Sequence, residues 1–193
     1  MPAFMRLAAE LRESGELAPD PSLGTAVTAS FARHTAGRDL MACVLEIEGF
    51  RVKTADRYAS AEDAVALCLD PEVTALCYSV QATYDLPGIM RVDGLLKEAG
   101  IRSRIVFNAG GSPVSRKIAE KARCDVYAPA AAESARMVAE AVRKKRLARD
   151  GLRSSIQHYS LTFQDTFQTD KTIVFHTVAP DLNPDRSAIR TSC

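Results

Sequence analysis

The sequence lacks several features that mark particular classes of protein. No apolar run reaches the roughly 18 residues that a membrane helix needs, and the amino terminus lacks the basic and then apolar layout of a signal peptide. Lys and Arg number 25 against 24 Asp and Glu, so the chain has no strong basic field for sequence-independent nucleic-acid binding. We therefore expect a cytoplasmic protein whose direct partner is neither a membrane nor a nucleic acid.

Cysteine is scarce and scattered. The five cysteines are an odd number without a CxxC spacing, which excludes the usual patterns of a disulfide framework or a zinc site. Those that lie in apolar stretches are interpreted as small core residues: Cys43, Cys68, Cys77 and Cys124. The sequence also contains no phosphate loop of the form GxxxxGK[ST] and no recognisable Ser-His-Asp order. These absences give little support to an enzyme that works alone.

The sequence does contain an alternation of short β-prone runs with helical patterns. Strands are predicted at 25–31, 50–54, 73–79, 103–108 and 125–128. Helices are predicted between and after them, at 36–48, 60–69, 86–99, 112–123 and 130–148. This order predicts an α/β fold with a five-stranded, doubly wound parallel sheet of the Rossmann type and flavodoxin-like strand order.

Two extensions flank this domain, so the predicted divisions are 1–23, 24–148 and 149–193. The first holds an amphipathic helix at 3–17, followed by a proline-containing linker. In the last, residues 156–178 alternate with period 2 and predict a β-hairpin before an extended arm. We expect the amino-terminal helix and the hairpin to contact a partner protein. The exposed hairpin edge could also pair with a second copy of the chain.

Polar residues and glycines gather in the loops that follow the first, third and fourth strands. Ligands of open parallel sheets bind at this edge, and the candidate cofactor-binding residues there are His34, Gly37, Ser79, Gln81, Tyr84, Gly110, Gly111 and Ser112. Glycines let a flat ligand approach the backbone, and Tyr84 could stack on it. One histidine cannot form a closed metal site. His34 as a metal ligand would therefore need a cofactor with its own equatorial ligands, such as a corrin or a porphyrin.

This order of residues resembles the cobalamin-binding domain of mutases, methionine synthase and corrinoid proteins over about residues 24–143. The shared pattern is HxxG after the first strand, Ser at the end of the third and GG after the fourth. The resemblance implies that His34 is the lower axial ligand of cobalt and that Gly37 lies close to the cofactor. It further implies that Ser79 bonds the nucleotide tail and that Gly110 and Gly111 form the floor of its groove.

The family pattern reads DxHxxG, SxL and GG, and this chain departs from it twice. Ala32 stands in place of the aspartate and Gln81 in place of the leucine. The aspartate would orient the imidazole, and such outer partners are typically worth about 10–100-fold in metal affinity. The segment His34-Thr35-Ala36-Gly37 is similar to that of light- or redox-sensing regulators of purple bacteria, whose related domains bind cobalamin or heme. We therefore expect a tetrapyrrole-binding sensor or regulatory subunit that acts through a partner protein.

Two alternatives come from the same resemblance. One is the cofactor-carrying small subunit of an adenosylcobalamin-dependent mutase, whose catalytic barrel is a separate chain. The other is a degenerate, ligand-free domain that serves as a structural or scaffolding subunit, for which Ala32 and Gln81 are the motivation. Methyl-carrying corrinoid proteins place a helical bundle ahead of the domain, whereas 24 residues precede the first predicted strand here.

A basic cluster closes the last predicted helix, and its members are Arg143, Lys144, Lys145, Arg146, Arg149 and Arg153. Such a cluster could contact phosphates. Cations at the carboxyl end of a helix also complement the helix dipole without any partner, and this is the interpretation we favour from the sequence.

Overall fold

The computed structural model describes residues 3–15 and 17–167 of the chain. The chain divides into two units, Met1–Leu152 and Arg153–Cys193, and the sheet lies in the first. In chain order the elements are α1 (Ala3–Glu13), β1 (Thr25–Ser30), α2 (Ala36–Ile47), β2 (Arg51–Thr54), α3 (Ala61–Leu67), β3 (Val73–Ser79), the 3-10 helix η1 (Thr83–Asp85), α4 (Leu86–Glu98), β4 (Val106–Gly110), α5 (Arg116–Lys121) and α6 (Ala131–Phe167). Within the described residues, no helix is both long and apolar enough to cross a membrane.

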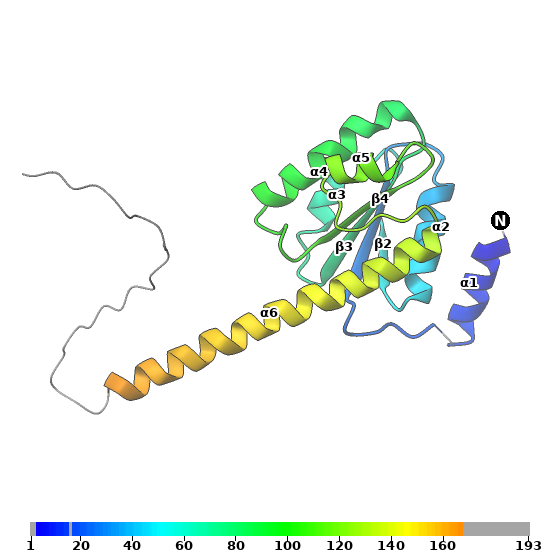
Figure 1. The fold of residues 1–193 in the computed structure, drawn as a ribbon. Coiled ribbons are helices and arrows are strands. Elements are labelled where there is room, and N and C mark those ends of the chain that lie inside the picture. Colours follow the sequence, from blue (N-terminus) through cyan, green and yellow to red (C-terminus); the bar gives the residue numbers. More distant parts are fainter. Residues whose placement is uncertain (1–2, 16, 168–193) are drawn as a thin grey trace, which may run out of the picture. The chain divides into compact units, whose positions relative to one another are not determined.

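The sheet is parallel and has the order β2-β1-β3-β4, which confirms the predicted doubly wound α/β fold (Figure 1). The prediction of five strands is wrong, because the segment 125–128 makes only one bridge, from Val126 to Asn108. The side chain of Asp125 explains this. Its carboxylate accepts the Phe107 N–H at 2.7 Å, so a side chain takes a donor that a fifth strand would have used. Pro129, which has no N–H, follows directly.

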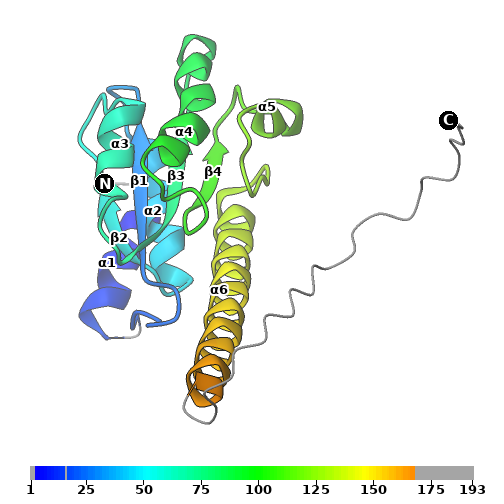
Figure 2. The same cartoon turned by 90° about the vertical axis from the view of Figure 1, so that its left-hand side faces the viewer.

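Two hydrophobic layers cover the sheet, one on each face. Side chains of β1 and β3 alternate between them: Val27 and Leu76 pack with α3 and α4, whereas Ala26 and Ala75 pack with α2 and the first turns of α6. Helices α3 and α4 lie side by side on their face of the sheet (Figure 2). Because both faces are covered, all six residues of β1 are buried, as is usual for a parallel strand.

Local sequence signals account for several helix boundaries. Ser60 accepts the Asp63 N–H at 3.1 Å, and Asp63 accepts the Ser60 N–H in return, which forms a capping box at the start of α3. The predicted helix at 86–99 is confirmed as α4, with Pro87 in its first turn and Gly100, at φ +70°, just after its end. The predicted amino-terminal helix at 3–17 forms as α1, which ends at Glu13.

Two predictions about the later helices are wrong. The helix expected at 112–123 begins only at Arg116, where Ser115 accepts the Ile118 N–H and caps it. The helix expected at 130–148 continues to Phe167. Residues 158–164, the first half of the predicted hairpin, are therefore helical, since unbroken helical hydrogen bonding overrides their period-2 pattern. Residues 171–178, the second half, lie outside the described residues.

The cysteines behave as the sequence predicts. Cys43, Cys68 and Cys77 are buried and Cys124 is half-buried, and all four are free thiols. Burial raises the pKa of Cys68 and of Cys77 to about 12. The thiols therefore stay neutral at physiological pH and act as small apolar core groups.

A buried carboxylate joins α4 to the loop after it. Asp93 is 6% exposed and accepts hydrogen bonds from Lys97 Nζ at 2.6 Å and from Arg102 Nε at 2.6 Å. Arg102 also donates to Asp125 at 2.9 Å. Burial favours the neutral acid and raises the pKa of Asp93, but the hydrogen bonds to Lys97 and Arg102 outweigh it, so the net pKa is lowered.

Asp93→Asn is expected to destabilise the protein by about 2 kcal/mol at pH 7, because it removes the buried charge that Lys97 and Arg102 share, while Arg102 keeps its contact with Asp125. A lowered pKa in the folded state means that the stabilisation is present above the unfolded-state pKa of about 4 and is lost as the pH falls through the folded value. Urea unfolding at pH 7 and at pH 3 measures this. The difference between wild type and Asp93→Asn should shrink at pH 3, while Asp56→Asn, at an exposed position, should change little. An equal loss at both pH values would contradict the ion-pair explanation.

Candidate functional site

A cavity of about 210 Å³ opens at the carboxyl edge of the sheet. It lies where β3 and β4 end beside the first turns of α2 and α6, and its lining residues are Gly37, Leu40, Met41, Tyr78, Ser79, Asn108, Gly110, Gly111, Ala128, Pro129, Ala131 and Ser134. Parallel pairing sets Ser79 opposite both Ser30 of β1 and Gly110 of β4, so the strand ends meet at one edge. The structure thus brings together four of the residues predicted from the sequence: Gly37, Ser79, Gly110 and Gly111.

Gly37 and Ser79 form one wall of the cavity through close approach. A Cβ at position 37 would lie 2.5 Å from Ser79 Oγ, which is closer than real side chains come. Glycine at the start of α2 therefore lets the helix lie directly against the end of β3. Within the described residues the Ser79 hydroxyl makes no hydrogen bond, and the residue is half-buried at the cavity. Ser79 is consequently available to a ligand.

Gly110 and Gly111 differ in what they allow. Gly111 has φ +117°, and a Cβ there would overlap the backbone carbonyl group of Val80. Only glycine can make this turn without moving β3. At Gly110 an added Cβ would meet no atom within 4 Å, although the residue lines the cavity. The first glycine therefore leaves open space, and the second shapes the backbone.

The inner end of the cavity is lined by two polar residues. Neither was among the site residues predicted from the sequence. Asn108 and Ser134 are both buried, and Ser134 Oγ donates to Asn108 Oδ1 at 3.1 Å. The pair joins β4 to the first turn of α6. Asn108 was visible as a polar residue within an apolar strand. Ser134 carries no such signal, because a serine in the first helical turn is ordinary.

His34 lies in the loop between β1 and α2 and is exposed. Its imidazole makes no hydrogen bond within the described residues, and it does not line the cavity. Gln81, which replaces the family leucine, donates a hydrogen bond from its side-chain amide to the backbone carbonyl of His34. This contact links the loop that bears His34 to the loop that follows β3.

The remaining predicted site residues lie outside the cavity. Tyr84, on η1, is 80% exposed, and Ser112 is exposed beyond the glycine turn. Because α5 begins only at Arg116, Ser112 is not at a helix amino terminus. In this chain Ala32 occupies the position of the family aspartate, and Asp39 does not take over that role. The Asp39 carboxylate accepts hydrogen bonds from Thr35 Oγ1 at 2.7 Å and from Arg38 Nε at 2.9 Å instead.

Across the part of the chain that the structure describes, no group of three or more His, Cys, Asp or Glu side chains is placed to hold a metal ion. Among the predicted site residues, only His34 has an imidazole, and none has a carboxylate. Any metal at this edge would have to bring most of its ligands with it, as a tetrapyrrole does.

Known proteins with similar sequences and structures share this architecture. The chain is 30% identical over 114 residues to trimethylamine corrinoid protein 1 of Methanosarcina mazei, covering 58% of this chain and 53% of that protein. It superposes with a TM-score of 0.60 and 26% identity on the monomethylamine corrinoid protein of Methanosarcina barkeri, covering 72% of this chain and 65% of the other. The methanol:cobalamin methyltransferase complex of Methanosarcina barkeri gives a TM-score of 0.57 at 22% identity, covering 68% and 50% of the two chains, and shows the fold alone.

No protein-family model matches the chain. The chain spans about half the length of the relatives that it matches in sequence. The similarity in sequence, the shared parallel fold and the convergence of Gly37, Ser79, Gly110 and Gly111 on one cavity agree with one another. In sequence and in fold, the chain is therefore similar to cobalamin-binding corrinoid proteins.

Proposed function

We propose that this chain binds a corrinoid cofactor at the carboxyl edge of its sheet and presents it to a partner protein. The observation that carries the proposal is the cavity formed by Gly37, Ser79, Gly110 and Gly111, which come from three separate segments of the chain. A cavity of about 210 Å³ is smaller than the roughly 300–1,000 Å³ that buries a drug-sized ligand. It therefore suits one arm of a larger ligand whose remainder lies outside.

The residues present fit the nucleotide tail of cobalamin. Gly110 leaves open space at the wall, and Ser79 offers a hydroxyl without a partner among the described residues. The buried Asn108 and Ser134 supply polar groups at the inner end. Heme has no nucleotide arm that could occupy such a cavity, so the geometry favours cobalamin over heme.

His34 would hold the metal of a bound corrinoid through its imidazole in this proposal. The corrinoid would supply the cobalt chemistry, and the protein would supply the ligand and the surrounding cavity. The imidazole of His34 is exposed and, within the described residues, without a hydrogen-bond partner, so nothing here competes for its nitrogens. Gln81 would position the backbone of the His34 loop through its hydrogen bond to the carbonyl.

A second part of the proposal concerns what the corrinoid-bound chain does with its partner protein. The similar proteins are named for trimethylamine and monomethylamine, and one structural neighbour is a methanol:cobalamin methyltransferase complex. These names favour, as a second candidate, a corrinoid subunit that carries a methyl group between partner enzymes. The sensor or regulatory role stays a prediction from the His34-Thr35-Ala36-Gly37 segment. The available Ser79 hydroxyl and the open space at Gly110 argue against a ligand-free scaffold.

Reconstitution tests the proposal directly. The full chain is mixed in turn with hydroxocobalamin, adenosylcobalamin and hemin, desalted, and examined by visible absorption. Retention of about one equivalent of a cobalamin, with hemin released, is the expected result. Protein that leaves the column colourless after each mixture would overturn the proposal.

Ser79→Ala is expected to weaken cobalamin binding by roughly 3–10-fold, which corresponds to the loss of one hydrogen bond of about 0.5–1.5 kcal/mol. The change should leave stability unaltered, because the hydroxyl has no partner among the described residues. Titration followed by absorption gives the affinity. Ser112→Ala is the matched control, since Ser112 is exposed and does not line the cavity. Equal affinities for the two variants would contradict the assigned role of Ser79.

A further inference from the structure

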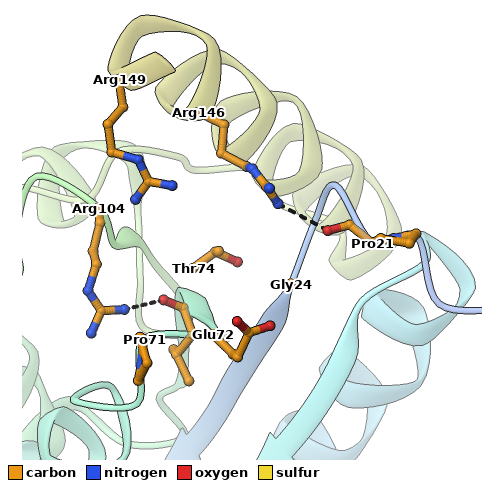
Figure 3. A pocket seen from close by; sticks show the side chains of 9 residues that line it. Pro21, Gly24, Pro71, Glu72, Thr74, Arg104, Arg146 and Arg149 are labelled. Atoms are coloured by element: carbon orange, nitrogen blue, oxygen red, sulfur yellow. Dashed lines mark hydrogen bonds between the residues drawn. The ribbon is translucent and has the colours of Figure 1, made fainter. Parts of the chain in front are cut away.

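A second cavity lies at the opposite, amino-terminal edge of the sheet, before the starts of β1 and β3. It has a volume of about 130 Å³, and its lining residues are Pro21, Gly24, Pro71, Glu72, Val73, Thr74, Arg104, Arg146 and Arg149 (Figure 3). Three arginines from two distant parts of the chain meet here. We call this cavity the arginine pocket.

Backbone carbonyls hold two of the three guanidinium groups in place. Arg104 donates to the carbonyls of Val73 at 2.5 Å and Cys68 at 2.6 Å, as well as to two neighbouring carbonyls. Arg146 donates to the carbonyls of Pro21 at 3.0 Å and Ser22 at 2.8 Å. A carbonyl orients a guanidinium without neutralising its charge. These two cations are therefore fixed in position before any ligand arrives.

Arg149 is different, because within the described residues it has neither a hydrogen bond nor an ion pair. Its guanidinium extends from α6 toward the pocket, above Arg104 (Figure 3). The only acidic residue in the lining, Glu72, is paired with Arg51 at 2.8 Å. Within the lining, three cations thus face one carboxylate, which is already paired with Arg51. Asp70, outside the lining, also attracts Arg104 but is itself paired with Lys53. The lining therefore has an excess of two positive charges, which suits a doubly charged anion better than a singly charged carboxylate.

The helix dipole does not account for this cluster. The sequence pattern predicted that the helix ends near residue 148, where cations would complement the dipole, but α6 continues to Phe167. The dipole effect fades beyond the last turn of a helix. Arg146 and Arg149 therefore lie mid-helix, where the dipole gives no reason for their positions.

We propose that the arginine pocket binds a phosphate group. A phosphate monoester carries a charge of about −1.5 to −2 at pH 7, and its oxygens match the forked donors of arginine. A volume of about 130 Å³ holds one such group, being well below the roughly 300 Å³ at which pockets for whole drug-sized ligands begin. The ligand class is a molecule with a terminal phosphate, and the site is separate from the corrinoid site at the other edge.

Calorimetric titration of the cofactor-free full chain with inorganic phosphate, at low ionic strength, tests the proposal. Wild type should bind one equivalent saturably, and Arg149→Gln should weaken binding about tenfold, as expected for loss of a charge-assisted hydrogen bond. Arg149 has no partner to lose among the residues that the structure describes, so this variant should fold normally. Arg136→Gln is the matched control, because Arg136 is exposed on the same helix and outside the pocket.

Competition identifies the chemistry of the ligand. Phenyl phosphate should displace inorganic phosphate, whereas acetate at the same concentration should not. Non-saturable binding by wild type, an equal loss in Arg136→Gln, or equal displacement by acetate would each overturn the proposal. Because the titration uses protein without cobalamin, its failure would be separate from failure of the corrinoid proposal.

Discussion

His34→Ala is expected to abolish the absorption band of histidine-coordinated cobalt in protein reconstituted with hydroxocobalamin. The imidazole is the only one among the predicted site residues, so nothing there can replace it. Loss of an outer partner of a metal ligand typically costs about 10–100-fold in affinity, and loss of the ligand itself should cost no less than about tenfold. The measurements are visible absorption and a cobalamin titration of wild type and variant.

Measuring the stability of His34→Ala distinguishes a role in cobalt binding from a structural role of His34. His34 is exposed and its side chain makes no hydrogen bond within the described residues, so His34→Ala should unfold within about 0.5 kcal/mol of wild type. His158→Ala, which removes a histidine outside the sheet domain, is the control for unspecific histidine binding. A histidine band that survives in His34→Ala and disappears in His158→Ala would refute the assignment.

The missing aspartate offers a complementary variant. Ala32→Asp places a carboxylate two residues before His34, as in the family pattern. If His34 binds cobalt, that carboxylate should orient the imidazole and raise the affinity by about tenfold. In the His34→Ala background the same change should have no effect. A gain of similar size with and without His34 would show that the carboxylate acts elsewhere.

Gly110→Leu and Gly111→Ala are expected to change different properties, although the two residues are adjacent. The first should weaken cobalamin binding, and the second should lower stability. Gly110→Leu should keep the free energy of unfolding within about 0.5 kcal/mol of wild type, because an added Cβ meets no atom within 4 Å. We expect it to weaken cobalamin binding by roughly 10–100-fold by occupying space at the cavity wall. Gly111→Ala should destabilise the protein by about 3 kcal/mol, because φ is +117° and Cβ would overlap the Val80 carbonyl.

Urea unfolding and cobalamin titration of both variants together provide the check. Each variant controls for the other, since both remove a glycine from the same turn. Gly111→Ala that folds as stably as wild type would mean that the turn can relax away from Val80. Gly110→Leu with unchanged cobalamin affinity would mean that the nucleotide arm does not pass Gly110, and the proposed position of the cofactor would have to be abandoned.

Local sequence signals predicted the elements whose boundaries depend on neighbouring residues. Pro87 and Gly100 mark the ends of α4 because each restricts or permits backbone angles by its own covalent structure. The segment 125–128 was predicted as a strand because its composition suits one. It forms a single bridge because the Asp125 carboxylate takes the Phe107 N–H, a competition that becomes visible only once the two segments meet.

The residues of the candidate site also fall into two groups, those whose position the sequence predicted and those whose position it did not. Gly37, Ser79, Gly110 and Gly111 were predicted from a family pattern and line one cavity. Tyr84 and Ser112 were predicted from their nearness in sequence to strand ends, yet both lie outside it, because loop direction decides where a side chain after a strand points. Gln81 was interpreted as a departure from the family and instead contacts the backbone of His34.

The sequence by itself determined the alternation of strands and helices, the parallel α/β class and the order of the motif residues, because periodicity and turn chemistry are local properties. Only the tertiary structure decided which residues share a cavity. Ser134 meets Asn108 across 26 positions of sequence, and Arg104 shares a pocket with Arg146 and Arg149 of α6. Contacts of that kind follow from how helices pack on a sheet, and no local pattern encodes them.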